Sequence, residues 1–143
     1  MSSVLQKNAT IALSMFCAAN AFAADAPELS FQIDPAWAAK VVCSEIRSVP
    51  SPRITIGNLP ASTSSLSLQM TDLTYKHYDH GKGEVSATDL ADQTLSEGAF
   101  EVTRPCPKKG KVHEYEFELK AFDASENEIA AGIQILPILS TRK

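Results

Sequence analysis

The sequence has no excess of basic residues, no apolar run long enough to span a bilayer and no serine-nucleophile motif. Lysine and arginine number 13 against 17 aspartates and glutamates, and the formal net charge is −4 at pH 7. A mildly acidic chain is poorly suited to nucleic acid, so we expect no nucleic-acid partner. The apolar run at residues 9–19 is too short for a transmembrane segment. Without a G-x-S-x-G motif or another recognisable pair of nucleophile and base, we expect that the protein is not an enzyme.

The amino-terminal stretch has the features of a secretory signal peptide. Lys7 is the only charge before Asp25, an apolar run follows it, and Ala-Phe-Ala at residues 21–23 has the form of a signal peptidase site. We predict a signal peptide at residues 1–23 and a single domain at residues 24–143. The mature chain is then expected in the periplasm or outside the cell. A short buried amino-terminal helix is the alternative.

Cysteine is scarce, and the chain has three in all. Cys17 lies in the predicted signal peptide, so the mature chain keeps Cys43 and Cys106. An even number in an oxidising compartment favours a disulfide between them. This bond would close a loop worth roughly 4 kcal/mol in the chain-entropy model. Two free buried thiols are the alternative, and neither cysteine belongs to a C-x-x-C redox pair.

Alternation of apolar and polar residues predicts a mostly-β protein with little helix. In the strand that begins at His113, apolar residues face one side and charged residues the other; Ser65–Asp72 also alternates. The polar segment 73–98 is predicted as long loops, with a helical turn near residues 89–93. Shorter strands are expected at residues 29–33, 54–56, 100–102 and 129–138, and an extended or turning stretch at 48–52. The sum predicts an antiparallel β-sandwich.

Two segments carry distinctive motifs. Cys43 is followed after seven residues by SPRITIGNLPASTSSLSLQMTD, which ends at Asp72, and RPCPKKGKVHEYEFELKAFD spans residues 104–123. In order and spacing they resemble the "C…SP…LP…DPDAP" and "GPCPPKG…HRYxFxLYALD" signatures of the phosphatidylethanolamine-binding protein (PEBP) family, in its bacterial, exported Raf-kinase-inhibitor-like branch. The resemblance implies a β-sandwich with a small pocket at one end that binds anions, including phosphate headgroups.

The resemblance also implies which residues line such a pocket. The first Asp of the DPDAP turn falls on Asp72, and the strand-opening His and Tyr fall on His113 and Tyr115. The proline turn of the family falls on Pro105 and Pro107.

A further histidine of the family pocket belongs to a His-Trp pair that this chain lacks. Either His77 or His80 stands in for it, and we include His80 among the candidate ligand-binding residues. The resemblance also puts Cys43 and Cys106 at positions where bacterial members often carry cysteines.

The residues themselves allow more than one chemistry. His113 shares the parity of the core-facing residues of its strand, so it needs a polar partner, and Asp72 would accept its hydrogen bond if the two strand ends meet. A purely structural Asp–His–Tyr cluster is the alternative. Lys108, Lys109 and Lys111 crowd one turn, where they attract an anion or only keep the turn solvated. The His-Tyr-Asp-His stretch at residues 77–80 follows no standard metal motif, so no metal or cofactor is expected.

Two functions follow from these patterns. One is an exported binding protein with a site for phosphate or a lipid headgroup. The other is a protein-interaction or inhibitor module with a degenerate pocket, in which residues 73–98 contact a protein partner. The missing DPDAP and His-Trp features motivate the second hypothesis.

Overall fold

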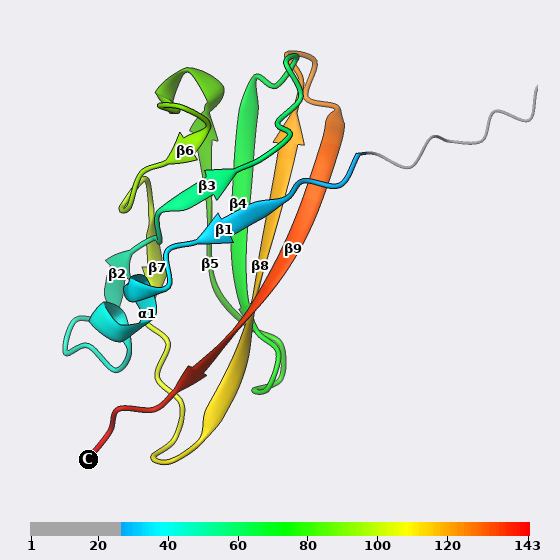
Figure 1. Cartoon of the computed structure of the whole chain (residues 1–143). Helices are drawn as coiled ribbons and strands as arrows, with labels where there is room; N and C mark the ends of the chain where they lie inside the picture. The colour runs from blue at the N-terminus through cyan, green and yellow to red at the C-terminus, as the bar shows by residue number, and fades with distance from the viewer. Residues whose placement is uncertain (1–26) are drawn as a thin grey trace, which may run out of the picture.

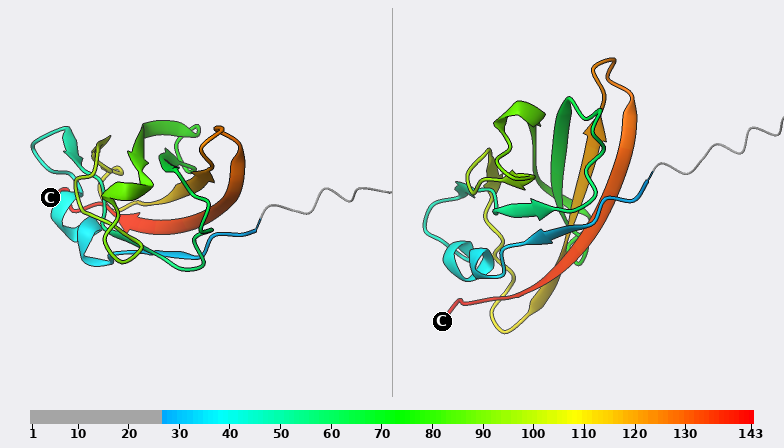
Figure 2. Two further views of the ribbon diagram at one scale, coloured as in Figure 1. Left: turned by 90° about the horizontal axis from the view of Figure 1, so that it is seen from above. Right: turned by 45° about the horizontal axis from the view of Figure 1, so that its top comes forward.

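The computed structural model describes residues 27–143, so the predicted signal peptide at residues 1–23 lies outside the described residues. The chain forms two layers of antiparallel strands with one short α-helix (Figure 1). The larger sheet has the order β5-β4-β8-β9, and the smaller sheet, β1-β3-β6, lies across one of its faces (Figure 2). β2 pairs with β7 beside them. The predicted β-sandwich with little helix is confirmed. The elements are β1 (Phe31–Ile33), α1 (Ala36–Val41), β2 (Ser48–Pro50), β3 (Ile54–Ile56), β4 (Ser65–Asp72), β5 (Tyr78–Ser86), the 3₁₀ turn η1 (Ala87–Asp89), β6 (Thr94–Leu95), β7 (Glu101–Thr103), β8 (Val112–Phe122) and β9 (Glu128–Leu139).

The core lies between the two layers and follows from the alternation in β4 and β8. Leu68 of β4 pairs with Leu119 of β8, and Met70 pairs with Phe117. All four side chains are buried. The small sheet covers them with its own inward apolar residues, and each buried aliphatic side chain contributes about 1.5–3 kcal/mol. The covering residues are Phe31, Ile33, Ile54, Ile56 and Leu95.

Helix α1 closes one end of this core and was not predicted. Pro35 and Trp37 suggest an interruption of strand structure, but the Asp34 side chain accepts a hydrogen bond from the Ala36 N–H and starts a helical turn instead. The indole of Trp37 is fully buried, donates to the Pro50 carbonyl at 2.8 Å and meets the Phe117 ring edge-on. Within residues 27–143, no helix has the length and apolar character needed to cross a membrane.

Strand β5 corrects the prediction that residues 73–98 are loops. Two of its inward positions are occupied by Gly81 and Gly83, and Val85 is the inward apolar residue, so the apolar alternation by which strands are recognised is weak. A side chain at Gly83 would collide with the ring of Phe100, and one at Gly81 would press on the backbone of Val102. The glycines therefore let residues 100–102 pack directly against the sheet. The helical turn expected near residues 89–93 occurs slightly earlier, as η1.

Strand β9 forms one edge of the large sheet, and part of that edge is covered. The Ala131 carbonyl accepts from the Leu29 N–H at 2.8 Å, and the Ala131 N–H approaches the Pro27 carbonyl. Alternate residues of a strand direct their backbone groups to the same side. The backbone groups of Ile133 and Pro137 therefore also point to this edge, and Pro137 has no N–H to donate there.

The cysteine pair is joined as predicted. Cys43 and Cys106 form a disulfide with their Cα atoms 4.5 Å apart. The Cys43 N–H also donates to the Pro105 carbonyl at 2.9 Å. The segment after α1 is thereby fixed to the proline turn that leads into β8.

Candidate functional site

Three strands bring polar side chains together at one end of the large sheet. Asp72 is the last residue of β4, and it pairs with Tyr115 of β8 on one side and Tyr78 of β5 on the other. His113 lies two residues before Tyr115 and therefore on the same face of β8. The two strand ends thus meet, which is the condition under which the parity of His113 makes Asp72 its hydrogen-bond partner.

Asp72 is the hub of this cluster and is almost completely buried. Its Oδ2 accepts a hydrogen bond from Nδ1–H of His113 at 2.6 Å. Its Oδ1 accepts from the backbone N–H groups of Thr74 and Tyr75 at 2.9 and 3.0 Å. A buried carboxylate requires such partners. These contacts hold the chain in a tight turn after β4 and fix the orientation of the His113 ring.

The Tyr115 hydroxyl also interacts with this carboxylate. Tyr115 is buried, and burial raises the pKa of its hydroxyl far above the usual value because the phenolate would be poorly solvated. The negative charge of Asp72 raises the pKa further. Tyr115 therefore remains a neutral hydrogen-bonding group throughout the physiological pH range.

His80 reaches the cluster through a β-bulge. Met70 pairs with Gly81 and Thr71 with Asp79, so His80 is the extra residue between them. Bulges of this kind re-aim a side chain. The Asp79 side chain accepts from the Gly81 N–H at 2.8 Å and supports the bulge.

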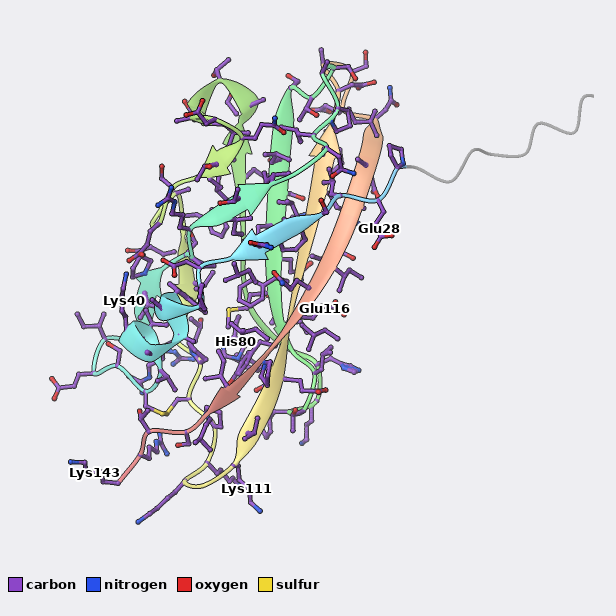
Figure 3. The ribbon with its side chains drawn as sticks, in the orientation of Figure 1. Glu28, Lys40, His80, Lys111, Glu116 and Lys143 are labelled. Carbon is purple, nitrogen blue, oxygen red and sulfur yellow. A yellow bond between two sulfur atoms is a disulfide. The ribbon has the colours of Figure 1, made fainter. Side chains whose placement is uncertain are left out.

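The ring of His80 is buried and held in one orientation. Its Nδ1 lies 2.9 Å from the Thr103 carbonyl, and since a carbonyl only accepts, Nδ1 carries the hydrogen. The ring contacts Tyr78 and Tyr115 edge-to-face, with centroids 5.0 and 5.2 Å away. Figure 3 shows His80 near the lower end of the large sheet.

These groups surround a cavity of about 440 Å³. Arg104 contributes a guanidinium whose Nη1 donates to the carbonyls of Ser44 and Glu45, beside the disulfide. Lys108 follows on the proline turn. The cavity is lined by Asp72, Tyr75, Tyr78, His80, Arg104, Cys106, Lys108, His113 and Tyr115.

Four of the six candidate ligand-binding residues lie in the cavity wall: Asp72, His80, His113 and Tyr115. His80, rather than His77, is the histidine that joins the other three. Pro105 and Pro107 are fully buried and are not part of the wall. They flank Cys106, which does line the cavity, so the two prolines lie behind the cavity wall.

Three residues of the wall were not singled out from the sequence: Arg104, Tyr75 and Tyr78. Arg104 immediately precedes the Pro-Cys-Pro motif, which is the one local signal that would have found it. Of the three lysines in the turn, Lys108 lines the cavity and the other two do not. Figure 3 shows Lys111 at the tip of that turn, away from His80.

The alternative of a metal site finds no geometric counterpart in the part of the chain that the structure describes. Within residues 27–143, no group of three or more His, Cys, Asp or Glu side chains is arranged to hold a metal ion. His77 and His80 do not converge on the cavity together.

The architecture defines a class of fold, a PEBP-like β-sandwich. The structure resembles that of E. coli YbcL, a new member of the mammalian PEBP family, with a TM-score of 0.50 and 19% identity over 63% of this chain and 80% of that one. It also matches a PEBP homologue from Chlamydia trachomatis, CT736, with a TM-score of 0.47 and 18% identity over 62% of this chain and 80% of that one. The likeness to YbcL shows that the fold is PEBP-like. No model of a protein family matches the sequence, and no curated protein does.

Proposed function

We propose that this chain is an exported small binding protein that holds a phosphate-like anion in the cavity at the end of its sandwich. The observation that carries the proposal is the composition of the cavity wall. Arg104 and Lys108 supply two permanent cations, and His80 and His113 supply two imidazoles. The two cations recognise phosphate and carboxylate by charge-assisted hydrogen bonds. Each imidazole already uses its Nδ1–H on Thr103 or Asp72, so it donates Nε2–H to an anion in its protonated form. The proposal is for binding, not for catalysis.

Export is part of the proposal. The signal-like residues 1–23 support it, and the Cys43–Cys106 disulfide supports it because such bonds persist mainly in oxidising compartments. Mass spectrometry of the protein purified from the periplasm or medium of an expressing bacterium tests this directly. We expect a chain that begins at Ala24. A full-length chain retained in the cytoplasm would refute export without touching the anion site.

The anion site is tested by calorimetry with inorganic phosphate and phosphoethanolamine at low ionic strength. We expect His113→Ala and His80→Ala to weaken phosphate binding by tenfold or more, since each removes one of the oriented imidazoles. His77→Ala is the matched control, because His77 is exposed and outside the cavity wall. Absence of binding by the wild type, or equal binding by all three variants, would sink the proposal.

A second candidate function is the interaction module. Tyr75 and Tyr78 lie at the cavity rim with 52% and 40% of their surface exposed, which suits contact with a protein partner. Residues 78–86 form a strand of the large sheet, so deleting them would disturb the fold. Point substitutions are therefore the better test of a partner contact. If Tyr75→Ser combined with Tyr78→Ser leaves partner capture from a periplasmic extract unchanged, this candidate fails.

A further inference from the structure

The cavity contains one carboxylate among the described residues, and the fold already uses it. Asp72 accepts three hydrogen bonds, from His113 and from the backbone N–H groups of Thr74 and Tyr75, and its charge also acts on the Tyr115 hydroxyl. An ionised carboxylate has about four lone-pair positions, so most of its acceptor capacity is used within the fold. Asp72 is also almost completely buried, which limits its contact with a positively charged group of a ligand.

The cations of the cavity, in contrast, have donors to spare. Nη1 of Arg104 is held by the carbonyls of residues 44 and 45, whereas the remaining guanidinium N–H groups have no partner among residues 27–143. The Lys108 side chain is exposed and makes no ion pair within that part of the chain. Together with the single carboxylate of Asp72, Arg104 and Lys108 leave the cavity wall with a net positive charge.

We infer that the cavity takes a phosphate monoester with no cationic substituent, and that Arg104 and Lys108 determine this specificity. A monoester carries a charge of about −1.5 to −2 at neutral pH and three terminal oxygens. Those oxygens suit donors that come from β5, β8 and the proline turn. A phosphodiester has one charge and two such oxygens. An attached ammonium group would meet two cations and a single carboxylate that is buried and largely occupied within the fold.

This inference rests on the proposed anion site and narrows the class of anion that the site accepts. The phosphate monoester has two sources, a soluble organic phosphate or the headgroup of a phosphatidic acid. Both present the same terminal phosphate, so the shared chemistry is what the cavity recognises.

The test compares phosphoethanolamine with N-acetylphosphoethanolamine, which differs by the loss of the ammonium charge. We expect the acetylated compound to bind more tightly by roughly five- to tenfold. It lacks the ammonium charge, which the two cations would repel in a partly solvated site. Glycerol 3-phosphate should bind like the acetylated compound, and glycerophosphoethanolamine, a zwitterionic diester, should bind most weakly. Flotation with vesicles of phosphatidylcholine, with and without phosphatidic acid, then separates the lipid source from the soluble one.

Adjacent lysines provide a matched pair of variants. The preference is the ratio of the affinity for the acetylated compound to that for phosphoethanolamine. Lys108→Gln should reduce this ratio to less than about half of its wild-type value. Lys109→Gln should leave the ratio unchanged, because Lys109 lies outside the cavity wall. Arg104→Lys keeps the charge and should retain the preference with weaker binding. If both phosphate compounds bind the wild type equally, the inference is wrong and the anion site stands. If no anion binds, both are wrong.

Discussion

At the scale of single residues, Asp72 combines a structural and an orienting role. It ends β4, holds the following turn through two backbone N–H groups, and fixes the His113 ring. A carboxylate that is bonded in this way is difficult to replace, because any substitute leaves buried donors unsatisfied. Asp72 is therefore required for the shape of the cavity, and most of its acceptor capacity is used within the fold.

The Asp72→Asn variant tests this role. The amide keeps the size of the side chain but loses the charge that the His113 bond depends on, and it turns one acceptor into a donor. We expect a loss of about 1.5–3 kcal/mol in the free energy of unfolding, measured by urea denaturation. Asp89→Asn is the control, since Asp89 is exposed, and should leave stability within about 0.5 kcal/mol of the wild type. Equal effects of the two variants would contradict the role of Asp72.

Tyr115 gives the molecule a dependence on alkaline pH. Its folded-state pKa is raised above the ordinary value of 10.0, so the unfolded chain releases this proton at a lower pH than the folded chain. The stabilisation is fully present below pH 10 and is lost as the pH rises above it. Unfolding measured between pH 8 and pH 11 should show the wild type losing more stability above pH 10 than Tyr115→Phe does. Parallel curves for the two proteins would disprove the shift.

At the scale of elements, β5 depends on the absence of side chains. Gly83 leaves the space that the Phe100 ring occupies. Gly83→Ala should destabilise the protein by about 1–3 kcal/mol through overpacking. The loss should be smaller in the background of Phe100→Ala, where the ring is absent, and a double-mutant cycle by chemical denaturation measures the difference. Additive effects would show that the two residues do not compete for space.

The open edge of β9 yields a different prediction. Ala131 is already bonded to the segment before β1, and Pro137 cannot donate, so an incoming strand finds few partners. Ile133 and Ile135 are nevertheless exposed there. Pro137→Val should extend the pairing edge and increase self-association, visible as a larger sedimentation coefficient at high protein concentration. Glu128→Gln, at the opposite end of β9, is a control that should remain like the wild type.

At the scale of the whole molecule, the sequence predicts the strands whose inward residues are apolar and misses those whose inward residues are not. β4 and β8 were recognised from Leu66–Met70 and Tyr115–Ala121, and the same parity made Asp72 the partner of His113 if the two strand ends met. β5 was missed because Gly81 and Gly83 carry no apolar signal. The position of His80 depends on a bulge, and that of Arg104 on carbonyls distant in sequence, so their orientation toward the cavity does not follow from a local pattern.

The disulfide stabilises the molecule as a whole. The two cysteines are 63 residues apart, and a loop of that size contributes roughly 4 kcal/mol in the chain-entropy model. Replacing both cysteines with serine should lower the free energy of unfolding by about that amount, measured in urea. Alkylation of the unreduced native mature chain should label no thiol. Labelling of two thiols would exclude the bond.

The position of the disulfide also divides the chain into an enclosed part and a free part. Strands β2 to β7 lie between the two cysteines, whereas the hairpin of β8 and β9 lies beyond Cys106. That hairpin is built from neighbouring residues, joined across a turn held by Asp123, so closing it costs little loop entropy. It can therefore form early and act as the template onto which β4 docks. A part of the chain that is synthesised later would then organise the part made before it.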